Sequence, residues 1–176
     1  MENPLYNYFQ MVARVDALCR GIQDLLSGQI TCSEGCSSCC TSITLFPVEA
    51  AALHAALDAL PDARRAAAIR RHAAAHAAGE RCPLLEEHRC LLYAARPIIC
   101  RTHGLPIIYT EGGERKVDCC PLNLSEGEHS VSGSAIIDLD RLNTLLVAVN
   151  ALYLSHADVT GLPERLTIAE ALKVKP

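Results

Sequence analysis

Nine cysteines gather in three short stretches of this chain, and their thiols are the side chains best suited to chemistry. The first stretch holds four within nine residues: Cys32, Cys36, Cys39 and Cys40. The others are Cys82, Cys90, Cys100, Cys119 and Cys120. Cysteine thiolates bind zinc and iron–sulfur clusters. The pattern therefore predicts a metal centre within residues 32–120, with these nine residues as candidate ligands.

The spacing fits two kinds of centre. Four thiolates around one zinc ion lie about 3.8 Å apart, and the tight loop Cys36-x-x-Cys39 suits that closeness. The remaining spacings do not form the second C-x-x-C pair of an ordinary zinc ribbon. Three cysteines in one loop, Cys32-x-x-x-Cys36-x-x-Cys39, plus a distant fourth are typical of a [4Fe–4S] cluster. Zinc and an iron–sulfur cluster both remain open.

Two pairs of candidate ligands are neighbours in the sequence: Cys39 with Cys40, and Cys119 with Cys120. Adjacent residues cannot easily both reach one tetrahedral ion without backbone strain. Either one member of each pair packs elsewhere, or a pair bridges two metals. The cysteines therefore form two four-thiolate sites with one residue left over, or one site with additional structural thiols.

Cationic side chains flank Cys100. A four-thiolate zinc site or an oxidised [4Fe–4S] site carries a net negative charge, which is costly to bury without facing cations or N–H donors. Arg96, Arg101 and His103 are candidates for neutralising that charge or for anchoring an anion beside the metal. They could instead be ordinary surface residues, and His103 is also a possible ligand.

Two other features have a more ordinary interpretation. Cys19 lies on the apolar stripe of an expected helix, where a small buried hydrophobe is the favoured role. His72 and His76 have the i, i+4 spacing of a metal-binding pair, but a solvated polar face is more common.

The elements that must position these thiols are mostly helical. Half of the chain is hydrophobic, mainly Ala and Leu, and 176 residues fit one domain spanning 1–176. We expect helices at 5–27, 48–59 and 62–78, a turn near Pro97, and helices at 139–156 and from Thr167. Extended segments are expected at 43–45, 82–85 and 90–93, with a hairpin at 105–119 and a loop at 122–137. The fold class is thus a small, mainly α domain with a cysteine-rich metal-binding loop region and a short β-hairpin.

Apolar stripes predict which helix faces are buried. The first helix has one formed by Phe9, Val12, Val15, Cys19, Ile22 and Leu26. The helix at 139–156 has another, formed by Leu142, Leu145, Leu146, Val149, Leu152 and Tyr153.

Composition and charge limit where in the cell this protein is expected and what it is expected to bind. The net charge of −4 gives no reason to expect nucleic acid as a partner. No apolar run is long enough to cross a membrane, and the first residues lack the features of a signal peptide. We therefore expect a cytoplasmic protein whose partner is a metal ion, since thiols there are normally reduced. The sequence indicates no protein partner.

An ordered run of residues resembles a known family. It reads Cys36-x-x-Cys39-Cys40, then Cys82-Pro83-Leu84-Leu85-x4-Cys90-x-x-Tyr93-x-x-Arg96-Pro97-x-x-Cys100-Arg101. This run resembles the YkgJ-type cysteine-cluster proteins, which are described as zinc- or iron-chelating domains of the CxxCxxCC type. The resemblance covers about residues 32–120 and implies metal binding. Here three residues, rather than two, separate Cys32 from Cys36, and Cys119 or Cys120 matches the late cysteine of the family.

The sequence thus favours a metal-binding protein that holds zinc or an iron–sulfur cluster on clustered thiolates. The alternative is an enzyme: an iron–sulfur-dependent redox protein or a methyltransferase that uses S-adenosylmethionine. Flagellin lysine-N-methylases look distantly similar in their cysteine cluster, which keeps that alternative open. The lack of a Gly-rich nucleotide-binding loop argues against it.

Overall fold

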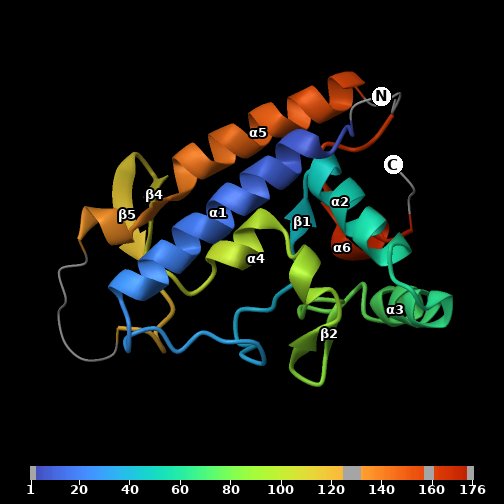
Figure 1. Cartoon of the computed structure of the whole chain (residues 1–176), viewed down its shortest axis with the longest axis horizontal. Coiled ribbons are helices and arrows are strands. Elements are labelled where there is room, and N and C mark those ends of the chain that lie inside the picture. The colour runs from blue at the N-terminus through green and yellow to red at the C-terminus, as the bar shows by residue number, and fades with distance from the viewer. Residues whose placement is uncertain (1–2, 125–131, 157–160, 174–176) are drawn as a thin grey trace.

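The computed structural model of the chain describes residues 3–124, 132–156 and 161–173 (Figure 1). Within them, the α-helices are α1 (Tyr6–Leu25), α2 (Pro47–Asp58), α3 (Ala63–Ala75), α4 (Ile98–Thr102), α5 (Leu139–His156) and α6 (Ile168–Ala171). Short 3-10 helices span Tyr93–Ala95 and Gly133–Ala135. The strands are β1 (Thr44–Leu45), β2 (Leu85–Glu86), β3 (Arg89–Cys90), β4 (Ile107–Glu111), β5 (Glu114–Asp118), β6 (Ile137–Asp138) and β7 (Leu166–Thr167). The prediction of a mainly helical protein is confirmed.

The two long helices, α1 and α5, lie side by side along the length of the molecule, with α4 beneath α1 (Figure 1). Their buried faces share one apolar core, which includes Val15, Ile22, Ile98 and Leu146. A second apolar core, which includes the buried side chain of Leu57, lies where α2, α3 and α6 meet. The segment that carries the first four cysteines crosses the lower side of this scaffold without regular secondary structure.

The strands of the described residues form three small sheets. β1 pairs antiparallel with β7, and β2 pairs antiparallel with β3. β4 and β5 form the expected hairpin around Gly112 and Gly113, whose positive φ angles of 62° and 85° suit glycine. β6 then adds to β4 in parallel. The sequence did not predict β6, since its partner precedes it by about thirty residues and local pattern carries no sign of the pairing.

The start of α4 is tied to the start of α2 by one buried carboxylate. Glu49, only 4 % exposed, accepts hydrogen bonds from the backbone N–H of Phe46 at 3.2 Å and of Ile98 at 3.1 Å. Burial raises the pKa of Glu49, and these two bonds oppose that rise. The contact fixes α4, and with it Cys100, against the most buried helix of the fold.

The predicted apolar stripes are wrong at three positions. Phe9 is 44 % exposed, and the stripe of α1 runs instead through Tyr8, Met11 and Val15. On α5, Leu145 and Leu152 are 53 % and 47 % exposed. The reason is that α1 packs against α4 and α5, and α5 packs against α1, α2 and β4, so each helix buries a stripe narrower than its apolar surface.

Other element boundaries agree with the sequence in part. The segments expected to be extended at 82–85 and 90–93 share only one residue each with β2 and β3, a 3-10 helix begins at Tyr93, and β7 was not predicted. α3 ends at Ala75 rather than at residue 78. The expected loop at 122–137 contains a 3-10 turn and β6, while residues 125–131 lie outside the described part. Thr167 and Glu170 form the predicted capping box of α6. Among the described helices, none combines the length and apolar character that crossing a membrane requires.

Candidate metal centre

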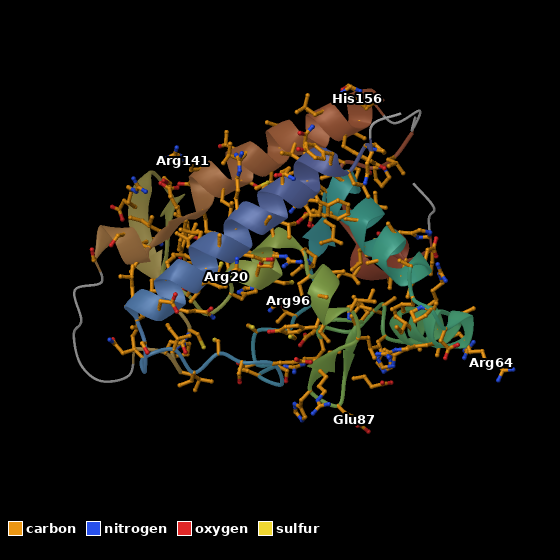
Figure 2. All side chains as sticks on the ribbon, viewed as in Figure 1. Arg20, Arg64, Glu87, Arg96, Arg141 and His156 are labelled. Carbon is orange, nitrogen blue, oxygen red and sulfur yellow. The ribbon has the colours of Figure 1, made fainter. Side chains whose placement is uncertain are left out.

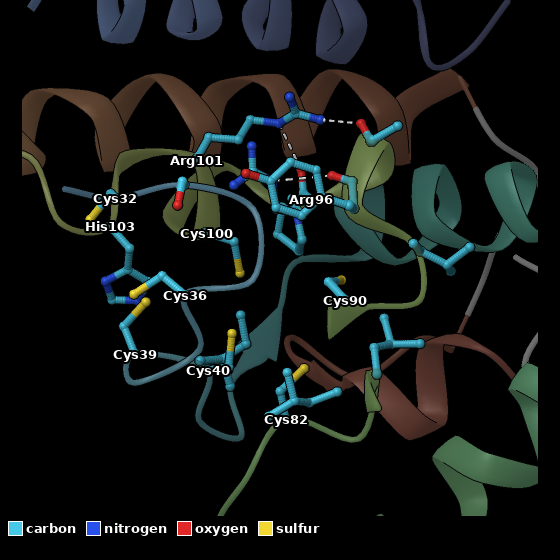
Figure 3. A pocket seen from close by; sticks show the side chains of 18 of the residues that line it. Cys32, Cys36, Cys39, Cys40, Cys82, Cys90, Arg96, Cys100, Arg101 and His103 are labelled. Atoms are coloured by element: carbon cyan, nitrogen blue, oxygen red, sulfur yellow. Dashed lines mark hydrogen bonds between the residues drawn. The ribbon is translucent and has the colours of Figure 1, made fainter. Parts of the chain in front are cut away.

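A cavity of about 500 Å³ opens beneath α1 and α4, beside the first cysteine segment and the β2–β3 hairpin (Figure 3). Seven of the nine candidate ligands line it: Cys32, Cys36, Cys39, Cys40, Cys82, Cys90 and Cys100. Residues separated by up to 68 positions in the sequence thus contribute thiols to one space. Cys119 and Cys120 are not part of its wall.

The first cysteine segment is folded by two tight turns. The N–H of Cys36 bonds to the carbonyl of Ser33 at 3.1 Å, and that of Cys40 bonds to the carbonyl of Ser37 at 3.1 Å. Gly35, with a φ of 100°, permits the first turn. The turns place all four thiols of this segment in the wall of the cavity.

The end of this segment pairs with the segment that precedes β2. The N–H of Cys82 donates to the carbonyl of Cys40 at 3.1 Å, and Thr41 forms a β-bridge with Arg81. Arg81 also donates to the carbonyl of Ser37 at 3.0 Å. Cys40 and Cys82, 42 residues apart in the sequence, therefore become backbone neighbours.

The β2–β3 hairpin places Cys90 near Cys82. Cys90 pairs with Leu85, whose N–H donates to the carbonyl of Cys82 at 3.0 Å. The backbone N–H groups of Leu84 and Leu92 lower the pKa of the Cys82 and Cys90 thiols, against the larger effect of burial, which raises it. N–H donors aimed at sulfur stabilise thiolate charge, as neighbours of metal ligands typically do.

Cys100 extends from α4 toward the same three thiols. Burial, with further contributions from Cys82, Cys90 and Cys40, raises the pKa of Cys100 to about 12. Burial also raises the pKa of Cys82 to about 11. These thiols hold their protons at neutral pH, so a metal ion must displace them to bind. We call Cys40, Cys82, Cys90 and Cys100 the first group.

The second group is Cys32, Cys36, Cys39 and Cys120. Charge interactions connect Cys32 with the other three, and they connect Cys39 with Cys40 of the first group as well as with Cys36 and Cys120. Cys32 and Cys120 are held by shared neighbours. The N–H of Cys120 lies 3.4 Å from the carbonyl of Gly104, and the side-chain amide of Asn123 donates to that carbonyl at 2.6 Å and to the Cys32 sulfur at 3.3 Å.

The members of each adjacent pair have different surroundings. Cys39 points toward Cys36 and His103, and Cys40 points toward Cys82 (Figure 3), while the pKa of Cys40, raised mainly by burial, is still influenced by Cys36 and Cys39. Cys120 interacts with Cys32 and Cys39, whereas the neighbours that influence Cys119 are Asp118 and Cys120 themselves. Among the described residues, no three His, Cys, Asp or Glu side chains already lie close enough to one another to hold a metal ion.

Arg96 and Arg101 have different surroundings. The guanidinium of Arg96 stacks 3.7 Å from the centre of the Tyr93 ring and contributes positive charge at Cys90 and Cys100. Figure 2 shows it between α1 and the β2–β3 hairpin. Arg101, by contrast, donates to both carboxylate oxygens of Asp16 at 2.8 Å and to the carbonyl of Arg96 at 2.7 Å. It fastens α4 to α1.

His103 lies beside Cys36 and Cys39 in the cavity (Figure 3). Burial lowers the pKa of its imidazole, which therefore stays neutral at physiological pH. A neutral ring is the form that binds metals, and it adds no charge that would offset the thiolates.

The remaining predicted features lie at the edge of this site or outside it. Cys19 is 7 % exposed, belongs to the core of α1, and its thiol donates to the carbonyl of Arg101 at 3.5 Å. His72 contacts the hairpin through the carbonyl of Leu85 at 3.1 Å, and His76 is exposed. Their rings lie 4.2 Å apart.

Sequence reasoning missed Asn123, Gly104 and Asp16. None of the three belongs to a ligand motif, and each contacts residues that are distant in the sequence and become neighbours only in the folded chain. Only Gly104 left a local signal: a glycine directly after the Cys100–His103 segment indicates a backbone conformation that other residues rarely adopt.

Comparison with known families agrees with the cysteine pattern. A family model described as "CxxCxxCC: putative zinc- or iron-chelating domain" matches residues 31–122, just over half of the chain. The chain belongs to this family. The matched region contains all nine candidate ligands as well as Arg96, Arg101 and His103. Neither a curated protein nor a solved structure matches the chain.

Proposed function

We propose that this protein binds zinc or an iron–sulfur cluster on the thiolates of its cysteine cavity. The observation that carries the proposal is the convergence of seven cysteines, from three segments of the chain, on one space beneath α1 and α4. The chelating family to which the chain belongs supports it. The nine cysteines at positions 32 to 120 are the proposed ligand set, within one domain spanning residues 1–176.

The donor set fits both candidate metals. Thiolate sulfur is a preferred ligand of zinc and of iron in clusters, and the N–H donors at Cys82 and Cys90 suit bound thiolates. A bound metal would hold the first cysteine segment against the hairpin and α4. Arg96 offsets part of the negative charge there, while the Arg101–Asp16 pair keeps α4 in place. The family description names chelation and no reaction, and it therefore supports binding ahead of the enzyme hypothesis.

The test uses two cysteine variants and a metal analysis of anaerobically purified protein. Cys100→Ser should lower the metal content, because this thiol is the most deeply placed of the first group. Cys19→Ser is the matched control: that thiol lines the same cavity but belongs to the helix core. We expect it to retain wild-type metal content.

Iron with acid-labile sulfide and a broad visible absorption band would identify a cluster, whereas a colourless sample with stoichiometric zinc would identify zinc. Full metal content in Cys100→Ser would contradict the ligand assignment. Wild-type protein without any bound metal, even after anaerobic reconstitution, would contradict the proposed function itself.

A further inference from the structure

We propose that the cysteines lining the cavity, together with Cys120 outside its wall, hold two separate four-thiolate centres, one on each cysteine group. The first is Cys40, Cys82, Cys90 and Cys100, and the second is Cys32, Cys36, Cys39 and Cys120. The inference rests on the proposed function, and it assigns each thiol to one centre. It also states which two cysteines of the chain bind no metal.

The divergence of Cys39 and Cys40 is the first support for two centres. The two residues are adjacent in the chain, yet their side chains extend to different sides of the loop (Figure 3). Cys39 lies with Cys36 and His103, and Cys40 lies toward Cys82. A tetrahedral ion accepts four ligands that converge on one point, so diverging neighbours serve two ions more easily than one.

The second support is that each group has its own backbone framework. The first is built by the bond from Cys82 to the carbonyl of Cys40, by the Leu85–Cys90 pair of the hairpin, and by the start of α4. Glu49 fixes that start through Ile98. None of these contacts involves a residue of the second group.

The second group is held by Asn123 and Gly104. The carboxamide oxygen of Asn123 accepts from the N–H of Thr31 at 2.8 Å, while its amide group reaches Cys32 and Gly104. The N–H of Asn123 bonds in turn to the carbonyl of Cys120 at 2.9 Å. This buried amide, 3 % exposed, therefore joins the segment before Cys32 to the one that contains Cys120.

Gly104 supplies the space that Cys32 needs. Its φ is 90°, and a Cβ added there would lie 2.3 Å from the Cys32 sulfur and 3.3 Å from the Asn123 amide nitrogen. Any larger residue at position 104 would therefore displace the Cys32 thiol of the second group, although every cysteine would still be present. Gly104→Ala is thus a way to disturb one centre without removing a ligand.

The number of cysteine ligands indicates what kind of metal centre each group would form. Eight cysteines fill four positions at each metal, and Cys19 and Cys119 remain unbound. A centre with four protein ligands has no open position for substrate. Two closed centres are therefore expected, of the kind that stabilises a fold or carries electrons, and the adjacent residues Cys39 and Cys40 would bind different metals.

The test is native mass spectrometry of anaerobically purified protein, which counts metal centres in each molecule. Wild type should carry two. Cys100→Ser should retain only the second, and Cys36→Ser and Gly104→Ala should retain only the first. Cys119→Ser is the matched control, since it removes a thiol adjacent to a proposed ligand, and it should retain two. Circular dichroism will confirm that each variant keeps its helices.

The outcomes separate this inference from the proposed function. A single centre in wild type that Cys100→Ser and Cys36→Ser both abolish would overturn the two-centre assignment, while metal binding on the thiolates would stand. Loss of both centres in each of the variants Cys100→Ser, Cys36→Ser and Gly104→Ala, with helices retained, would also overturn the two-centre assignment. Absence of metal from wild type would contradict the proposed function first.

Discussion

At the residue scale, one buried amide distinguishes the second cysteine group. Asn123 uses its oxygen as an acceptor toward Thr31 and its nitrogen as a donor toward Cys32 and Gly104. Asn123→Asp keeps the acceptor, removes the donor and places a negative charge beside a thiolate. Because partners of metal ligands typically contribute tenfold to hundredfold in affinity, we expect a loss of about that size for one metal. Competition with a chromophoric chelator measures it.

Asn150 provides the control for this prediction. It is also buried, and its carboxamide oxygen accepts from the N–H of Val48 at 3.1 Å, at the start of α2. Asn150→Asp preserves that acceptor at a helix N-terminus, where a negative charge is favourable. Metal affinity should therefore equal that of wild type. Equal losses in both variants would show that Asn123 acts through general stability and not through Cys32.

At the element scale, the packing of α4 on α1 decides where Cys100 lies. The Arg101 side chain is 8 % exposed and binds Asp16 through one guanidinium nitrogen that reaches both carboxylate oxygens. Asp16→Asn leaves this buried guanidinium without its counter-charge. Since Asp16 itself is partly solvated, we expect a loss of about 2 kcal/mol in the free energy of unfolding. Urea denaturation of the metal-free protein measures it.

A surface ion pair serves as the comparison for that loss. Arg115 on β5 lies 2.9 Å from Asp138, with side chains that are 57 % and 39 % exposed. Arg115→Ala should change the unfolding free energy by less than about 1 kcal/mol, because water and salt screen exposed pairs. If the two variants proved equally stable, the Arg101–Asp16 contact would not be what fastens α4.

At the scale of the whole molecule, the metal and the helices should stabilise different parts of the fold. Two apolar cores hold α1, α2, α3, α5 and α6 together, and the first cysteine segment contributes no residue to their fully buried set. A ligand that binds only the folded state stabilises it by about 4 kcal/mol at a thousand times its Kd. That stabilisation should be concentrated where the ligands lie.

Removing the metal should therefore loosen the cysteine segments and spare the helices. After chelation under reducing conditions, we expect backbone hydrogen exchange to accelerate at residues 31–42 and 82–92. The α1 and α5 amides should stay protected, since the apolar core around them is retained. Hydrogen-exchange mass spectrometry resolves these segments. Uniform acceleration across the whole chain would mean that the metal stabilises the helical core as well.

The sequence by itself determined much of this protein. Local patterns predicted the helices and the β4–β5 hairpin, because capping residues, proline, glycine and apolar periodicity act over a few positions. The types and spacing of the cysteines also indicated the chelating family. The sequence left two choices open: which neighbour of each adjacent cysteine pair joins a group, and whether the thiols form one group or two.

Only the tertiary structure decided how the thiols are grouped. Cys40 meets Cys82 through a β-bridge, Cys32 meets Cys120 through Asn123 and Gly104, and Phe9 turns outward because α5 covers a narrow stripe of α1. Each of these outcomes depends on contacts between residues that are tens of positions apart, or on what packs against a helix face. Local spacing carries no information about such contacts, since they arise only when the elements pack together.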